Sequence, residues 1–163
     1  EMKMTNPFKA RMMGGAFGLI AIISTAAWAE TPAPADLAQE EAYLNVLPKV
    51  EIPEDIQPIP GAVNEEFRNC RALWPAEYDQ VQSGPEARAL RDIYGYVQAR
   101  NVVATQDCAC AGKVASWADV ETLTTALRAE LGAQRLTWQH TKTIAEEADR
   151  LTAIAEAMCG GSF

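Results

Sequence analysis

Basic residues are scarce in this 163-residue chain, which has 14 of them against 22 acidic residues and a formal charge of −8. Proteins that bind nucleic acids neutralise phosphates with Lys and Arg, and polybasic segments draw proteins to anionic membrane surfaces. The sequence therefore argues against both kinds of partner. The remaining composition is that of an ordinary globular protein, with 48% hydrophobic and 22% charged residues.

Side chains suited to catalysis are few as well. The single histidine, His140, lies in a polar run, and we expect it to be a solvated residue. Past residue 29 the chain has only Ser83, Ser116 and Ser162, and none of these serines lies in a nucleophile elbow. No glycine-rich phosphate loop follows a strand pattern. The sequence predicts a protein that is not an enzyme and has no cofactor, with an enzyme of an unrecognised type as an alternative.

The first 29 residues have the pattern of an export signal. A basic start is followed by an apolar run at 16–27 and by small residues in Ala27-Trp28-Ala29. This order is typical of a cleavable bacterial signal peptide, so we expect cleavage before Glu30 and a periplasmic mature protein with no membrane span. The uncharged run at 12–29 is long enough for an uncleaved anchor, which is the alternative. The mature chain has 11 basic and 21 acidic residues, hence a formal charge of −10.

Residues 30–66 form the most acidic part of the chain, with nine acids, one base and six prolines. Because proline fixes φ and lacks a backbone donor, the prolines at 48–60 exclude a continuous helix there, although a short helix at about 35–47 fits the apolar spacing. We predict an extended acidic arm at 30–63 that is dispensable for folding and binds a protein partner. A solvated linker and a segment lying along its own domain are the alternatives. Four apolar residues among the prolines are the predicted partner-binding anchors: Val50, Ile52, Ile56 and Ile59.

From residue 64 onward, apolar residues recur at helical spacing. This spacing predicts an all-α bundle of three or four helices over 64–163. The expected helices are 65–73 and 75–82, divided by Pro75, then 86–103, and a long pattern at 117–158 that includes Trp138 in its apolar stripe. Ser116 is the expected N-cap of this last pattern. A lone glycine costs only about 1 kcal/mol inside a helix, so Gly132 alone does not decide whether the pattern breaks there.

Three aromatic residues carry further expectations. Tyr94 and Tyr96 are two positions apart on one predicted helix, so they cannot both point to the same side. We therefore expect one of them to be exposed. Phe163 follows the Gly160-Gly161-Ser162 tail, and we expect it to be frayed.

The four cysteines are the strongest chemical signal. An even number in a chain with an export signal predicts two disulfides among Cys70, Cys108, Cys110 and Cys159. A bridge from Cys108 to Cys110 would close a very small ring, so we expect each of these two to bond to a different partner. All four thiols meet at one end of the bundle if the chain folds back near 83–84 and again near Gly132, which favours a break at Gly132. A zinc site is the alternative, but zinc sites usually have C-x-x-C pairs, which this sequence lacks.

Together these features predict an exported, non-catalytic interaction or structural protein of the bacterial cell envelope. It is expected to bind a protein partner through the acidic arm and the helical bundle. A small subunit of a larger envelope-spanning assembly, such as a secretion or conjugation apparatus, is the first alternative. A metal-binding protein is the second. The sequence leaves the identity of the partner, the oligomeric state and the disulfide connectivity open.

Overall fold

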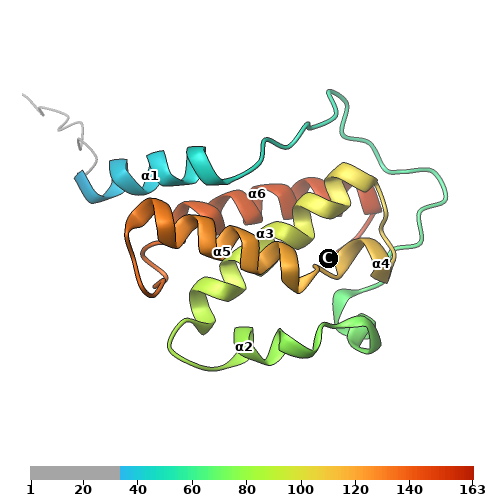
Figure 1. Cartoon of the computed structure of the whole chain (residues 1–163). Coiled ribbons are helices and arrows are strands. Elements are labelled where there is room, and N and C mark those ends of the chain that lie inside the picture. Colours follow the sequence, from blue (N-terminus) through green and yellow to red (C-terminus); the bar gives the residue numbers. More distant parts are fainter. Residues whose placement is uncertain (1–33) are drawn as a thin grey trace, which may run out of the picture. The chain divides into compact units, whose positions relative to one another are not determined.

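The computed structural model describes residues 34–163, with side chains from residue 39, and these residues belong to one compact unit (Figure 1). The expected signal segment at 1–29 lies outside the described residues. Every regular element in the described part is a helix, so the predicted all-α class is confirmed there. The elements are α1 (Pro34–Val46), the 3₁₀ helices η1 (Phe67–Leu73) and η2 (Ala76–Tyr78), α2 (Asp79–Gln82), α3 (Ala87–Thr105), α4 (Cys110–Lys113), α5 (Trp117–Leu131) and α6 (Lys142–Cys159).

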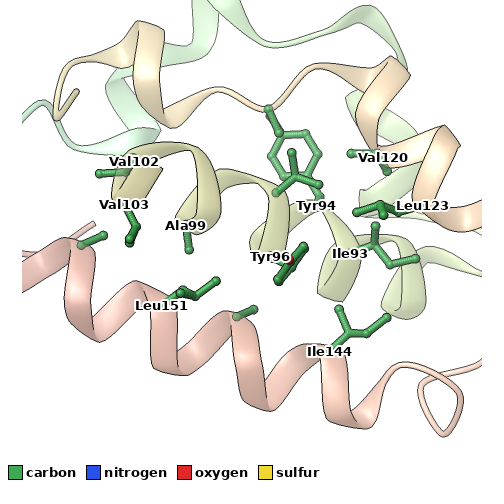
Figure 2. Packing of buried hydrophobic residues seen from close by; sticks show 14 of the residues in the cluster. Ile93, Tyr94, Tyr96, Ala99, Val102, Val103, Val120, Leu123, Ile144 and Leu151 are labelled. Atoms are coloured by element: carbon green, nitrogen blue, oxygen red, sulfur yellow. The ribbon is translucent and has the colours of Figure 1, made fainter. Parts of the chain in front are cut away.

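The longest helices, α3 and α6, pack against each other and run in the same direction (Figure 1). At their beginning, Thr141 Oγ1 donates a hydrogen bond of 2.7 Å to Asp92 Oδ2. Just beyond α3, Cys108 is bonded to Cys159, the last residue of α6. Between these two links, buried Ile93, Ile144 and other apolar side chains fill the space between the helices (Figure 2). Helix α3 is therefore the centre of the hydrophobic core.

The expectation that Tyr94 or Tyr96 is exposed was wrong, because both are buried. The two side chains leave α3 in different directions, but α3 has neighbours on several sides (Figure 2). The Tyr94 ring packs edge-on against Tyr78 with centroids 5.0 Å apart. Tyr96 lies on the side of α6 (Figure 2) and reaches Pro48. A helix that is covered all round can bury residues on opposite faces.

The long C-terminal pattern breaks at Gly132, as the cysteine count favoured. Ser116 caps α5 as predicted, since its side chain accepts a hydrogen bond from the Asp119 amide. Gly132 ends α5 with a φ of 61°, in the left-handed region that glycine adopts at little cost. Trp138 was predicted to be part of the apolar stripe of the last helix. It lies instead in the connection before α6 and is 57% exposed, so that prediction was wrong.

The described part of the arm contacts the helical bundle. Helix α1, which corresponds to the short helix allowed at about 35–47, packs against α5 and α6. The Asn45 side chain donates to Glu130 Oε1 at 2.9 Å. Residues 48–66, where the prolines lie, contain no helix. Composition alone predicts that the arm is dispensable for folding. Because the arm buries apolar surface against the bundle, however, we expect it to contribute to the stability of the domain.

Candidate functional site

Two disulfides join distant parts of the chain at one end of the bundle. Cys70 in η1 is bonded to Cys110 at the start of α4, with Cα atoms 5.2 Å apart. Cys108 is bonded to Cys159 at the end of α6, with Cα atoms 5.6 Å apart. The prediction of two intramolecular disulfides, with Cys108 and Cys110 bonded to different partners, is confirmed. Together the bonds hold η1, the α3–α4 connection and α6 at one end.

A buried lysine lies at the same end. Lys113, the last residue of α4, is 0% exposed, and its ammonium donates to Asn64 Oδ1. The Lys113 Nζ atom is also 4.9 Å from the centre of the Phe163 ring. Burial lowers the pKa of Lys113, and the carboxylates of Glu156, Glu65 and Glu66 oppose this shift. The ammonium therefore joins the beginning of the bundle to its C-terminal tail.

The C-terminal tail is held in place and is not frayed. The Phe163 amide donates to Glu156 Oε1 at 3.0 Å, and the Asn64 side chain donates to the Ser162 carbonyl at 3.1 Å. The expectation for Phe163 was therefore wrong. Its position follows from Lys113, because a buried ammonium is stabilised by the face of an aromatic ring. Gly160, with a φ of 72° that favours glycine, lets the chain turn back toward this group after α6.

The segment from Pro48 to Ala62 lies along α3 and α6. The Tyr96 hydroxyl donates to the Pro48 carbonyl at 3.0 Å, and the Ile59 amide donates to the Met158 carbonyl at 2.8 Å. Three of the four predicted anchors, Val50, Ile52 and Ile59, are partly buried against the core, whereas Ile56 is 41% exposed. This arrangement corresponds to the alternative in which the segment lies along its own domain. Binding of a partner by these residues stays a prediction.

A hollow of about 630 Å³ separates this segment from α3. Its apolar lining includes Val50 and Ile52 from the arm and Val103 and Ala104 from α3. Its charged and polar lining comes from both walls: Lys49, Glu51, Glu54, Arg100 and Gln106. The hollow is therefore lined by apolar side chains and by charges of both signs.

Three acids of the arm face solvent beside this hollow. Glu51, Glu54 and Asp55 are all exposed. In the part of the chain that the structure describes, every ion pair involves other residues, so these three carboxylates have no cationic partner there. The pairs that do exist join the helices of the bundle or neighbouring residues. The acidic surface of the arm, defined here as Glu51, Glu54, Asp55 and the exposed Ile56, is thus available to another molecule.

Other side chains offer little chemistry. Between residues 39 and 163, no group of three or more His, Cys, Asp or Glu residues is arranged to hold a metal ion. His140 lies in the turn before α6, where its Nδ1 accepts a hydrogen bond from the Thr137 amide at 3.0 Å. In this same part of the chain, no helix is long and apolar enough to cross a membrane.

Two features of this site were missed from the sequence. Lys113 was not recognised from the sequence, because a single lysine, even among the small and apolar residues at 108–115, is usually solvated. Asn64 directly precedes the helix expected at 65–73, and no local pattern indicates that its side chain joins Lys113 to Ser162. Comparison with protein families, curated proteins and solved structures found no match for this chain.

Proposed function

We propose that the chain is an exported, non-catalytic interaction protein of the bacterial cell envelope that binds a basic protein partner. The proposal includes removal of residues 1–29 before Glu30 and residence of the mature protein in the periplasm. Support for the compartment comes from the two disulfides, since such bonds persist in oxidising environments outside the cytoplasm. The acidic arm and the adjacent helices form the binding surface.

The observation that carries this proposal is the acidic surface of the arm. Its three carboxylates stand on a segment whose neighbouring apolar residues, Val50, Ile52 and Ile59, are held by the bundle. A flexible acidic tail would pay an entropic cost when a partner orders it, whereas carboxylates on an already docked segment avoid much of that cost. Uncompensated like charges also attract an oppositely charged partner over a distance and accelerate the encounter.

The hollow beside the acidic surface fits a basic side chain. Lys and Arg carry an apolar stem that packs on apolar surface and a charged head that stays near water or carboxylates. The stem would lie against Val50, Ile52 and Val103 in the hollow, and the head would lie beside Glu51 or Glu54. A basic segment of a protein partner therefore matches the charge of the acidic surface and the apolar part of the lining of the hollow.

The test is affinity capture from envelope extract with the mature chain, residues 30–163, as bait. A variant with E51Q, E54Q and D55N removes the charges of the acidic surface while keeping similar side-chain shapes. A control variant with E77Q, E121Q and E146Q removes three exposed charges from the helical bundle instead. The overall charge of the two variants is the same. A difference in capture between them therefore shows that binding depends on the carboxylates of the arm and not on net charge.

We expect the wild type and the control variant to capture the same basic protein, and the arm variant to lose roughly tenfold or more of it. Capture by the wild type should also weaken as salt rises, because exposed charges are screened over about 8 Å at physiological ionic strength. Equal capture by the three proteins at all salt concentrations would contradict the proposal. Capture of an acidic protein would do so as well.

A further inference from the structure

The connection between α5 and α6, residues 132–141, presents an exposed tryptophan. Trp138 is 57% exposed, although tryptophan is strongly buried on average in folded proteins. The connection is fixed on both sides of it, because the Leu136 amide donates to Glu86 Oε1 at 2.7 Å and the Thr141 hydroxyl donates to a buried carboxylate of α3. A partner that covers the indole ring therefore does not have to order this turn first.

Two cations flank this tryptophan. The chain has no acidic residue between Glu130 and Glu146. Within this stretch, Arg135 and Lys142 lie on either side of Trp138 in sequence, and both are exposed. Neither cation forms an ion pair with another residue that the structure describes. We define the Trp138 surface as these two cations and the indole ring, a combination that favours an acidic partner with some apolar surface.

The acidic surface of the arm has the complementary composition. Glu51, Glu54 and Asp55 are exposed carboxylates, and Ile56 beside them exposes 41% of its surface. Pro58, which is also exposed, follows two positions later. Extended segments that contain proline are commonly bound by aromatic side chains. Isoleucine and proline can thus pack on the indole ring while the carboxylates pair with Arg and Lys.

The two surfaces lie at opposite ends of the bundle (Figure 1). The hollow beside the acidic surface is lined by Val103, near the end of α3, whereas the Trp138 surface is held by Glu86, which directly precedes α3. The helix between these two points is about 25 Å long at 1.5 Å per residue. While the apolar residues of the arm are docked on their own bundle, the acidic surface cannot reach the Trp138 surface of the same chain.

We propose that the Trp138 surface binds the acidic surface of the arm of a second copy of this chain. Each contact uses a different surface from each of the two copies, so the copies associate head to tail. A second copy is favoured over an unrelated acidic protein because the chain itself carries an exposed segment of the required chemistry, already held in place by its bundle.

This contact rests on the proposed function in one respect, since it uses the same acidic surface. The basic partner of the proposed function is a different protein, and it competes with the second copy for that surface. The net charge of the mature chain makes two copies repel each other at a distance. At physiological ionic strength this repulsion is screened over about 8 Å, so ion pairs formed in direct contact outweigh it.

The experiment is analytical ultracentrifugation of the mature chain, residues 30–163, over a concentration series at about 0.15 M salt. We expect reversible self-association of the wild type. W138A should raise the dissociation constant about tenfold or more, because an exposed indole ring is typical of the residues that dominate binding. R135Q/K142Q and the arm variant E51Q/E54Q/D55N should weaken the association as well, because each removes one side of the ion pairs.

A mixture of two variants tests the pairing of the surfaces directly. W138A keeps the acidic surface, and the arm variant keeps the Trp138 surface. Neither should associate with itself, but each retains the surface that the other needs. We therefore expect the mixture to form a complex with one copy of each variant and no larger species.

Matched controls remove similar groups elsewhere. L73A removes a side chain that is 55% exposed from η1, and R68Q/R71Q removes two exposed cations from the same helix. Both should associate like the wild type. Control variants that weaken the association as much as W138A does would overturn the inference.

The remaining outcomes separate this inference from the proposed function. A wild type that is monomeric at every concentration, a W138A that associates like the wild type, or a mixture that stays monomeric would overturn the inference, whatever is captured from envelope extract. W138A retains the acidic surface and should still capture the basic protein. The expected self-association without capture of any basic protein would support the inference and contradict only the proposed function.

Discussion

The hydroxyl of Tyr96, in the middle of α3, donates a hydrogen bond of 3.0 Å to the carbonyl of Pro48, just beyond α1. Tyr96 is 1% exposed, so this bond joins the most buried helix to the beginning of the proline-rich segment. It fixes the point at which the chain leaves α1 and starts along α3. This hydrogen bond and the one from the Ile59 amide to the Met158 carbonyl position the acidic surface of the arm.

The tyrosines of α3 predict a loss of stability in alkali. Burial raises the pKa of both Tyr94 and Tyr96 to about 12, from an ordinary value of 10.0. A raised pKa in the folded state favours the neutral phenol, so this stabilisation is fully present below pH 10 and is lost as pH rises toward 12. Lys113 has the opposite effect on stability. Because burial lowers its pKa, its contribution to the free energy of unfolding rises as pH rises toward the ordinary value of 10.5.

The free energy of unfolding of the wild type should therefore fall more steeply above pH 10 than that of the variant Y94F/Y96F. Denaturant titrations at several pH values measure both curves, and Lys113 contributes equally to each. A variant whose stability falls as steeply as that of the wild type would show that other groups cause the alkaline loss.

Glu86 predicts a loss of stability in acid. Its carboxylate accepts hydrogen bonds from Arg128 Nη2 at 2.7 Å and from the Leu136 amide at 2.7 Å, and so holds the α5–α6 connection against the start of α3. Burial alone would raise the pKa of Glu86, but the bonds from Arg128 and Leu136 outweigh it and the pKa is lowered. A lowered pKa gives stability that is present above the ordinary value of 4.5 and lost as pH falls further.

We expect E86A to lower the free energy of unfolding by about 1–3 kcal/mol at neutral pH, because it leaves partly buried donors without an acceptor. The loss should shrink below pH 4.5, where the wild type gives up the same bonds. Thermal melting of both proteins from pH 3 to pH 7 provides the comparison, with the exposed E121A as a matched control. An unchanged difference across this range would refute the role of the charged carboxylate.

The disulfides should each contribute substantially to stability. They join residues 40 and 51 positions apart, and bridges over such distances typically stabilise small domains by about 2–5 kcal/mol. We expect the paired variants C70A/C110A and C108A/C159A each to lower the unfolding midpoint in denaturant. Peptide mapping without reduction should recover the pairs Cys70–Cys110 and Cys108–Cys159. Recovery of a Cys108–Cys110 peptide would contradict the structure.

Much of the fold follows from local sequence signals. The period of the apolar residues gives α3, α5 and α6, because these helices are long enough to show a stripe. A Cys108–Cys110 bond would close a very small ring, so each of these cysteines is expected to bond to a different partner. Because Cys159 must return to the same end of the bundle, the helical pattern is expected to break at Gly132. These inferences succeed because each depends on geometry within one helix or on a covalent constraint.

Features that depend on contacts between distant segments could not be predicted. The burial of both Tyr94 and Tyr96 requires that α3 be covered on several sides, which no single helix pattern reveals. The position of Phe163 depends on Lys113, and both residues look solvated in sequence. High charge and many prolines made the arm look unable to pack. Its few apolar residues nevertheless contact a core that the remaining helices already provide.

The most direct test of this account is the stability of a chain that begins at Asn64, compared with the mature chain from residue 30. In the structure the arm is docked, with Val50, Ile52 and Ile59 against the bundle and the carboxylates of Glu51, Glu54 and Asp55 facing solvent. Denaturant unfolding should then show a free energy of unfolding lower by roughly 3 kcal/mol or more for the shorter chain, since α1 and these side chains bury apolar surface. Equal free energies for the two chains would contradict the account and would show that the arm is a separate, solvated segment.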